Sequence, residues 1–384
     1  MKKIVIHCAS GIRNTGDEAI LDVLVRTFRE RCEITVICLD AGEAEKMHPG
    51  VQCMGNGDPG WKAAVEACDL FILGGGGLIQ DRTTMFNALR WLQKLAYAQK
   101  LGKKTFVYAN SLEPLQYGFN RRRAARYLRR ADAVTVRDPI SLEIARSLGA
   151  SQTVLTADPV YSYVQEPDAD RLRRKLPERY VVMTVRHWYD THPFIPVRLC
   201  NRWNIRSKKN QEKYESLIAR LTALADIINE EWGMPVVWLS CCIGRDAKVA
   251  RAVIERVKQP QNHVVLDDPQ MTPSEAMQVI GGAKLLIGMR LHGFIYAFLQ
   301  KTPVILLSYQ EKVRGMAQLA GVEDACFSVD DFDPKQVIQS AERLLQTPEL
   351  QEEPIAAFVE KMKVQQTENA HMAWMLLGED HGER

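Results

Sequence analysis

Residues 3–30 read KIVIHCASGIRNTGDEAILDVLVRTFRE, an apolar run joined to a helical pattern through a polar turn. The run KIVIHCA predicts a strand, because it is short, apolar and followed by turn residues. Ile20, Leu24 and Phe28 then recur at the spacing of a helix that buries one face. Strand, turn and helix in this order begin a βαβ unit, which predicts a parallel sheet.

The same alternation continues along the chain in two sets of apolar runs. The first set of predicted strands continues with 33–39, 68–74, 104–110, 133–138 and 152–158. The second set comprises 179–186, 235–240, 263–268, 283–289 and 303–308. Between the sets, residues 165–177 mix proline with alternating charge, which is typical of a hinge.

These two sets predict an α/β protein with two facing Rossmann-like domains, each a doubly wound parallel sheet, and a central cleft. The predicted domains are 1–165 and 178–350, and the residues 352–384 form a helical tail. The tail contains IAAFVEKMKVQQ, whose pattern is that of an amphipathic helix.

The composition is that of an ordinary globular chain. Of 384 residues, 46% are hydrophobic and 25% are charged, and the formal net charge is +3. This charge is too small for a dedicated nucleic-acid-binding protein. Nine cysteines without a CxxC pair indicate reduced thiols rather than a disulfide framework. The start lacks the apolar region of a signal peptide and no stretch is long enough to span a membrane, so we expect a cytoplasmic protein.

Cationic side chains follow predicted strands of the second domain. The segment LLIGMRLHGFIYAF (285–298) is almost wholly apolar, yet it carries Arg290 and His292. Burying an arginine is unfavourable unless an anion or a carboxylate faces it. Lys312 follows the next strand, and three such groups at strand ends favour a small, strongly anionic ligand. The alternative is structural, since a lone buried histidine more often belongs to the core.

Candidate residues also follow strands of the first domain. Asp17 and Glu18 occupy the first turn of a helix, either as capping residues or as carboxylates at the mouth of the cleft. The four glycines of FILGGGGLIQDR (71–82) expose backbone amides to a ligand, but they match neither a P-loop nor GxGxxG. VTVRDPIS ends a strand with Arg137 and Asp138, which would otherwise form a structural ion pair.

A long segment without clear periodicity, 187–213, follows Arg186. Segments of more than ~12–15 such residues are usually functional or mobile loops. Trp188, Tyr189 and Trp203 are suitable platforms for the face of a sugar, and we predict that the segment folds over one. The alternative is that these aromatic side chains anchor the loop on its own domain.

RRRAARYLRR (121–130) contains six arginines. Such a run is usually a solvated helix face, and it would also suit anionic phospholipid or a pyrophosphate-linked acceptor. No nucleic-acid-binding motif accompanies it, so we expect no nucleic acid as a partner.

The motifs GDEAIL, GGGGLIQD, VRDPIS, VRHW, IGMRLH and YQEKVRGMAQLAG occur in the order and spacing of the polysaccharide pyruvyl transferase family. The chain resembles this family over residues 3–325, and especially its bacterial branch acting on cell-wall polymers. The resemblance implies a GT-B-like fold and transfer of the enolpyruvyl portion of phosphoenolpyruvate onto a sugar as a ketal. Phosphate is released, and neither a metal nor another cofactor is implied.

The resemblance also implies roles for individual residues. Arg290, Arg137 and Lys312 would bind phosphoenolpyruvate. His292 would be the general acid, and Asp17 the base near the attacking sugar hydroxyl. From the placement of the glycine segment and of the 187–213 segment, we predict that the acceptor sugar contacts Gly75, Gly76, Gln80, Arg186 and Trp188. The implied partners are phosphoenolpyruvate, a lipid-linked glycan and the inner face of the membrane.

One departure and two alternatives accompany this resemblance. YANSLEPL (108–115) has Glu113 where many relatives have a glycine, which bears on the acceptor and not on the donor. A nucleotide-sugar-dependent glycosyltransferase or epimerase of the same fold would use the glycine-rich segment for a diphosphate and Glu311 for a ribose. A non-catalytic glycan-binding relative would have no need of Arg290, His292 and Asp17 together.

Overall fold

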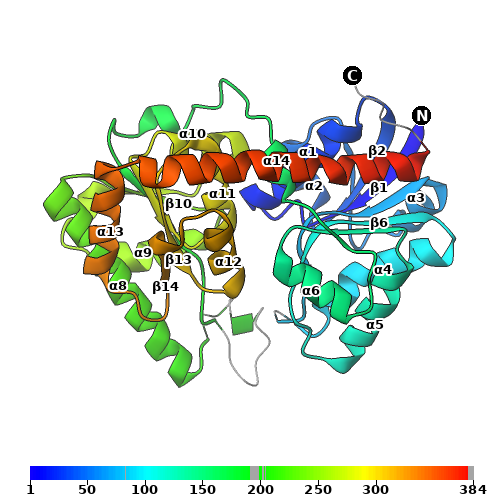
Figure 1. Cartoon of the computed structure of the whole chain (residues 1–384), viewed down its shortest axis with the longest axis horizontal. Helices are drawn as coiled ribbons and strands as arrows, with labels where there is room; N and C mark the ends of the chain where they lie inside the picture. Colours follow the sequence, from blue (N-terminus) through cyan, green and yellow to red (C-terminus); the bar gives the residue numbers. More distant parts are fainter. Residues whose placement is uncertain (83, 191–198, 201–202, 204, 379–384) are drawn as a thin grey trace. The chain divides into compact units, whose positions relative to one another are not determined.

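The computed structural model describes residues 1–82, 84–190, 199–200, 203 and 205–378 (Figure 1). The chain divides into two compact units, Met1–Val164 with Lys361–Arg384, and Gln165–Glu360. Each unit is built on one parallel sheet with helices on both faces. The segment 165–177 opens the second unit. The predicted tail is divided, because its residues from Lys361 onward group with the first unit.

The sheet of the first unit has the order β3-β2-β1-β4-β6-β7-β8, and β5 pairs with β6. Its strands are β1 (Lys2–His7), β2 (Cys32–Cys38), β3 (Gln52–Gly55), β4 (Leu70–Leu73), β5 (Gly76–Ile79), β6 (Lys104–Leu112), β7 (Ala133–Val136) and β8 (Val154–Leu155). The direction of winding reverses between β1 and β4. Ligands of open α/β sheets bind at the carboxyl ends of the strands that flank such a switch point.

The helices of the first unit are α1 (Thr15–Phe28), α2 (Ala41–Met47), α3 (Trp61–Ala67), α4 (Asn87–Lys100), α5 (Gly118–Arg130) and α6 (Pro139–Ser147). One face of the sheet packs against α3, α4, α5 and α6 through Val65, Trp91, Leu128 and Ala145. Helix α1 and part of α14 (Glu349–Leu377) lie on the other face (Figure 1). There the rings of Phe28 and Trp374 meet edge to face at 5.1 Å.

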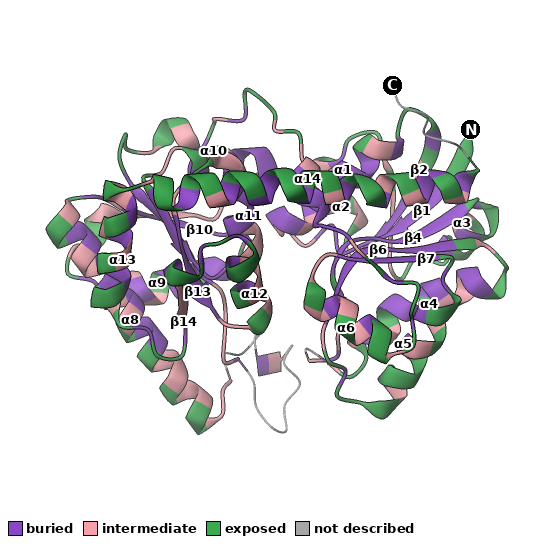
Figure 2. Cartoon of the chain, viewed as in Figure 1, coloured by how far each residue is buried: buried purple, intermediate pink, exposed green. Residues whose placement is uncertain are grey.

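The sheet of the second unit has the order β11-β10-β9-β12-β13-β14, with every pair parallel. Its strands are β9 (Val181–Thr184), β10 (Val236–Leu239), β11 (His263–Leu266), β12 (Leu285–Gly288), β13 (Val304–Ser308) and β14 (Cys326–Ser328). Its switch point lies between β9 and β12. The strands of both sheets form the buried centre of each unit (Figure 2).

The helices of the second unit are α8 (Lys208–Trp232), α9 (Asp246–Ile254), α10 (Pro273–Gly281), α11 (Leu291–Gln300), α12 (Glu311–Leu319) and α13 (Pro334–Gln346). Helices α8, α9 and α13 share one hydrophobic core with the sheet, which includes Leu221, Val253 and Val337. Phe298 of α11 packs edge-on against Phe358 of α14 at 6.0 Å. The two parallel-sheet α/β units confirm the predicted fold class.

Three strands were not predicted. β3 and β14 are only four and three residues long and are partly exposed, so neither reads as a buried apolar run. β5 begins with Gly76 and Gly77 of the glycine-rich segment, and glycines give no side-chain pattern that would indicate a strand. Both glycines belong to this strand, which pairs with β6.

Candidate active site

The switch point of the second sheet gathers polar side chains from four strands. Arg186 follows β9 and Asp246 follows β10, while Arg290 follows β12 and Tyr309 follows β13. Parallel strands present their carboxyl ends at one edge, so residues far apart in the sequence meet there. Gly288 lets the end of β12 lie close to Thr184 at the end of β9, because a Cβ at Gly288 would lie 1.9 Å from Oγ1 of Thr184.

The carboxylate that faces Arg290 belongs to the protein. Nε of Arg290 donates to Oδ2 of Asp246 at 2.9 Å, and Nη2 donates to Oδ1. Asp246 is 1% exposed, and its Oδ2 also accepts the backbone N–H of Cys242 at 2.8 Å. Burial lowers the pKa of Arg290, but the charge and hydrogen bond of Asp246 together with Cys242 and Cys241 raise that pKa above its ordinary value. The two-point contact holds the guanidinium in one orientation.

Tyr309 is half-buried among three cationic side chains. The guanidinium of Arg186 lies 4.4 Å from the centre of its ring, and Trp188 packs edge-on at 4.8 Å. Burial raises the pKa of Tyr309, but Arg186, Lys312 and Arg290 together lower it below its ordinary value. Arg186, Arg290 and Lys312 follow the adjacent strands β9, β12 and β13, so these three cations lie at one edge of the sheet.

His292 lies in the first turn of α11, two residues after Arg290. Its ring is partly buried, and its centre is 6.5 Å from that of Tyr296. The structure therefore brings Arg290, His292, Lys312 and Arg186 to one edge of the second sheet.

The described part of the 187–213 segment is held on the second unit. Trp188 and Tyr189 pack partly buried against the core of that unit, and the Tyr189 hydroxyl donates to Asp330 at 2.5 Å. Asp190 contacts His187 at 2.6 Å and Arg206 at 2.5 Å, which joins the two ends of the segment. These contacts agree with the alternative that Trp188 and Tyr189 anchor the segment on its own unit.

The other aromatic side chain of this segment, Trp203, is 59% exposed. Residues 191–198, 201–202 and 204 lie outside the described residues, and the predicted folding of the segment over a sugar falls partly on them. A contact between Trp188 and the acceptor stays a prediction.

At the switch point of the first sheet, the structure brings Asp17, Gly76 and Arg137 together. A Cβ at Gly76 would lie 3.2 Å from Oδ1 of Asp17. Arg137 is buried, where it donates to Ser111 at 2.9 Å and to Asp158. Burial lowers the pKa of Arg137, but Asp158, Asp138 and Asp17 raise it above its ordinary value. Arg137 thus lies in a different unit from Arg290 and Lys312.

The first glycines of the glycine-rich segment have a packing role. A Cβ at Gly74 would lie 3.2 Å from Cβ of Cys8, and one at Gly75 would lie 3.0 Å from Cγ2 of Ile20. Both glycines are buried, so they let this segment approach β1 and α1 closely. Gly77 is exposed, and Gln80 follows β5 partly buried.

Two acidic residues of the first unit have structural partners. Glu18 is buried, where it accepts from the Ser10 hydroxyl at 2.5 Å and the Gly11 amide at 2.9 Å. Glu113 accepts from Arg82 at 3.2 Å. Glu18 is therefore explained by the loop that it holds, whereas Asp17 remains the carboxylate beside the glycine segment.

Sequence reasoning missed Asp246 and Tyr309. Asp246 begins α9, and the distance of 44 positions from Arg290 hides the pairing from any local pattern. Tyr309 directly follows a predicted strand, and that position was the available signal. Its side chain carries no charge at neutral pH, so a search for ionic groups at strand ends passes over it.

Two further properties concern the described residues alone. They contain no cluster of three histidine, cysteine, aspartate or glutamate side chains that would hold a metal ion. Of the helices in this part of the chain, none combines the length and the apolar character that crossing a membrane requires.

Comparisons with known proteins show the family of the chain. Residues 14–311 match the family model described as polysaccharide pyruvyl transferase. The chain is 24% identical over 276 residues to the amylovoran biosynthesis protein AmsJ of Erwinia amylovora, covering 68% of this chain and 63% of the relative. The chain thus spans less than two thirds of that relative's length.

Solved structures share the fold. The S. aureus MnaA–UDP co-structure matches with a TM-score of 0.64 at 13% identity, covering all of both chains. The UDP-GlcNAc 2-epimerase from Neisseria meningitidis bound to UDP-GlcNAc matches with a TM-score of 0.60 at 12% identity, covering 98% of this chain and all of the other. A glycosyltransferase from Rickettsia africae matches with a TM-score of 0.60 at 10% identity, covering 98% of each chain. At these identities the likeness shows the GT-B-like fold alone.

Proposed function

Because the chain belongs to the polysaccharide pyruvyl transferase family, we propose that it transfers the pyruvyl group of phosphoenolpyruvate onto a sugar of a cell-wall or exopolysaccharide precursor. The observation that carries the choice of donor is that Arg186, Arg290 and Lys312 follow the adjacent strands β9, β12 and β13 at one edge of the sheet. Phosphoenolpyruvate has a phosphate and a carboxylate, and arginine and lysine bind both groups through charge-assisted hydrogen bonds.

In the proposed reaction, one sugar hydroxyl attacks C2 of phosphoenolpyruvate while C3 gains a proton and becomes a methyl group. A second hydroxyl of the sugar then replaces the phosphate, which leaves with the proton of that hydroxyl. His292 supplies the proton to C3, and Asp17 accepts the proton of the first hydroxyl. Asp17 suits this role because it adjoins Gly76, whose missing Cβ lets the carboxylate lie close to the backbone of the glycine segment.

Arg290 and Lys312 are the proposed donor ligands of the second unit. Asp246 orients Arg290, and that orientation precedes any ligand, so little side-chain entropy is lost when phosphoenolpyruvate binds. We keep Arg137 as a third donor ligand. Its contacts with Asp158 and Ser111 mean that its loss will disturb the first unit as well as the donor.

The acceptor in this proposal is a lipid-linked glycan that contacts Gly75, Gly76, Gln80, Arg186 and Trp188. The protein then works in the cytoplasm at the inner face of the membrane. The six arginines of α5 support this location, because all of them are exposed and a cluster of basic residues attracts anionic lipid.

Calorimetric titration with phosphoenolpyruvate tests the donor site. Lys312→Gln should weaken binding by roughly one to two decades, since a charged hydrogen bond contributes ~1.5–3 kcal/mol. Lys284→Gln is the matched control, because Lys284 is an exposed lysine of the same unit outside the site. Equal affinity in the wild type and Lys312→Gln would remove Lys312 from the donor site.

Thermal denaturation separates the proposal from its main alternative. A ligand that binds only the folded state raises its stability, so phosphoenolpyruvate should raise the melting temperature more than UDP-sugars do. The opposite order would favour a nucleotide-sugar enzyme. Incubation with phosphoenolpyruvate and a panel of lipid-linked and synthetic disaccharides, followed by mass spectrometry, should then reveal a ketal product. A protein that binds the glycans and makes no product in the presence of phosphoenolpyruvate would be a glycan-binding relative.

A further inference from the structure

Helices α4 and α5 of the first unit pack against each other and carry charge of one sign. They contain nine basic residues and no acidic residue. The basic residues are Arg90, Lys94 and Lys100 in α4, and Arg121, Arg122, Arg123, Arg126, Arg129 and Arg130 in α5. With the exception of Lys94, all of them are exposed. A surface of this kind attracts an anionic partner.

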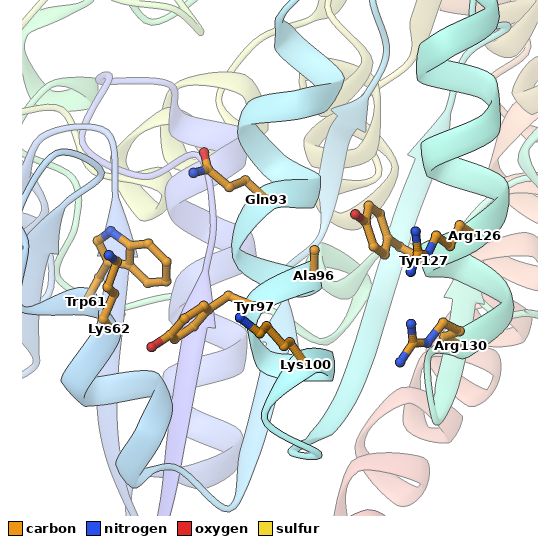
Figure 3. A pocket seen from close by; sticks show the side chains of 9 residues that line it. All are labelled: Trp61, Lys62, Gln93, Ala96, Tyr97, Lys100, Arg126, Tyr127 and Arg130. Atoms are coloured by element: carbon orange, nitrogen blue, oxygen red, sulfur yellow. The ribbon is translucent and has the colours of Figure 1, made fainter.

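The same face contains a groove of about 560 Å³, between α3, α4 and α5 (Figure 3). Its cationic side chains are Lys62, Lys100, Arg126 and Arg130. This volume lies within the usual ~300–1,000 Å³ of a small-molecule site. The charged surface of α4 and α5 therefore includes a groove of the size of a small-molecule site.

Aromatic side chains line the groove together with these cations. The rings of Trp61 and Tyr97 meet edge to face at 5.1 Å, and Tyr127 contributes the third ring. The buried Lys94 supports this wall, since its ammonium group lies 5.0 Å from the centre of the Trp61 ring. Trp61 is only 9% exposed, so the half-buried Tyr97 and Tyr127 are the rings that a ligand can reach. Tyrosine is enriched where proteins meet the headgroup region of a membrane, because its ring combines an apolar body with a polar atom.

The groove is separate from the candidate active site of the first unit. Lys100 and Arg130 are the last residues of α4 and α5, and each helix leads directly into a strand, β6 or β7. They therefore lie toward the amino ends of the strands, whereas Asp17 lies at the carboxyl ends. A ligand in the groove would leave the edge that holds Asp17 open.

We propose that this groove binds the anionic headgroup of a membrane phospholipid and so docks the protein on the membrane. This groove would make the membrane contact proposed above. The choice of a membrane as the partner rests on the proposed function. Cations supply the attraction for the phosphate, and the aromatic wall suits the boundary between headgroups and acyl chains.

Co-sedimentation of the full chain with vesicles tests the proposal. Vesicles of phosphatidylcholine alone are compared with vesicles that also contain phosphatidylglycerol. The groove variant is Arg126→Gln with Arg130→Gln, and the matched control is Arg121→Gln with Arg122→Gln, which removes equal charge from the same helix outside the groove. Circular dichroism melting verifies that both variants are folded.

We expect binding to depend on phosphatidylglycerol and to weaken with salt. Each basic residue at anionic lipid is worth ~1 kcal/mol, or about five-fold, so the groove variant should lose about 30-fold in partition coefficient. The control should lose several-fold less. Equal losses would assign the binding to diffuse charge and overturn the groove. Tighter binding of a single-stranded oligonucleotide at the same salt concentration would contradict the assignment of a lipid as the partner of the groove.

The proposed function and the lipid site can be tested separately. Pyruvyl transfer by the wild type to a water-soluble disaccharide requires no membrane. Its absence would contradict the proposed reaction, while the difference between the groove variant and its control would still decide the lipid site.

Discussion

At the scale of single residues, the sequence predicted that Arg290 has a negative partner, but it did not identify Asp246 as that partner. An arginine in an apolar segment requires a negative partner, and this requirement is local. The partner begins α9, which follows β10 on the other side of β9 from β12, and nothing in the pattern around Arg290 identifies it. The sequence therefore predicts that Arg290 needs a negative partner, but the identity of that partner depends on the order of the strands in the sheet.

Asp246→Asn tests whether this pair stabilises the fold. Removing one member of a buried ion pair leaves the other charge uncompensated and typically costs 3–5 kcal/mol, so urea denaturation should show a loss of about that size. Glu215→Gln breaks the Arg256–Glu215 pair, in which both side chains are 44% exposed, and should lose under about 1 kcal/mol. Similar losses in the two variants would show that Arg290 is not held by a buried charge.

His292→Asn should fold normally and lose most of the turnover. A side chain that transfers a proton contributes typically ~10²–10⁴-fold to the rate, and asparagine preserves polarity and approximate size. His371→Asn, at an exposed histidine of α14, controls for the substitution itself. A turnover near that of the wild type, or loss of the fold, would return His292 to a structural role.

Tyr309 should ionise at lower pH than an ordinary tyrosine. Its pKa is lowered by Arg186, Lys312 and Arg290 against the opposing effect of burial. Because the folded state releases this proton before the unfolded state does, ionisation adds stability as pH rises through the lowered pKa. That contribution is fully present above the unfolded pKa of ~10 and is lost as pH falls through the folded pKa.

Tyrosinate absorbance and urea denaturation at increasing pH measure both effects. Tyr309→Phe should remove the earliest absorbance change and the accompanying gain in stability. Tyr180→Phe should leave that change in place, because burial raises the pKa of Tyr180 to about 12. An early change that survives in Tyr309→Phe would mean that the three cations act elsewhere.

At the scale of elements, buried strands were predictable and short exposed ones were not. Each apolar run that we predict as a strand contains one, because the interior of a parallel sheet demands apolar side chains on both faces. β5 escaped prediction because its two glycines have no side chains to reveal a periodicity. Its register is set by pairing with β6, a tertiary contact.

The glycine segment allows a matched test within one element. Gly76 has φ +107°, and a Cβ there would lie 3.2 Å from the Asp17 carboxylate. Gly76→Ala should therefore strain the backbone, displace Asp17 and lower both turnover and stability, the latter by ~1 kcal/mol or more. An alanine at Gly77 would meet no atom within 4 Å. Gly77→Ala should thus behave nearly as the wild type, and equal defects would contradict a special role for Gly76.

At the scale of the whole molecule, the division of α14 between the units could not be predicted. Amphipathic spacing indicates a helix but does not say which sheet it covers. Two buried amides make the assignment. Gln351 exchanges hydrogen bonds of 2.9 Å with both backbone groups of Val304 in β13, in the second unit. Asn369 accepts from the hydroxyls of Thr135 and Thr156 at 2.6 and 3.0 Å, in the first.

Gln351→Leu and Asn369→Leu should therefore destabilise different units. Each substitution leaves buried polar groups without their partner, which costs about 1–3 kcal/mol per group. A loss of 1 kcal/mol lowers the melting temperature of a unit of this size by roughly 2–4 °C. If the units unfold separately, calorimetry will show two transitions, and each variant will shift only one of them. A common shift of both transitions in both variants would instead show that α14 joins the two sheets into one cooperative unit.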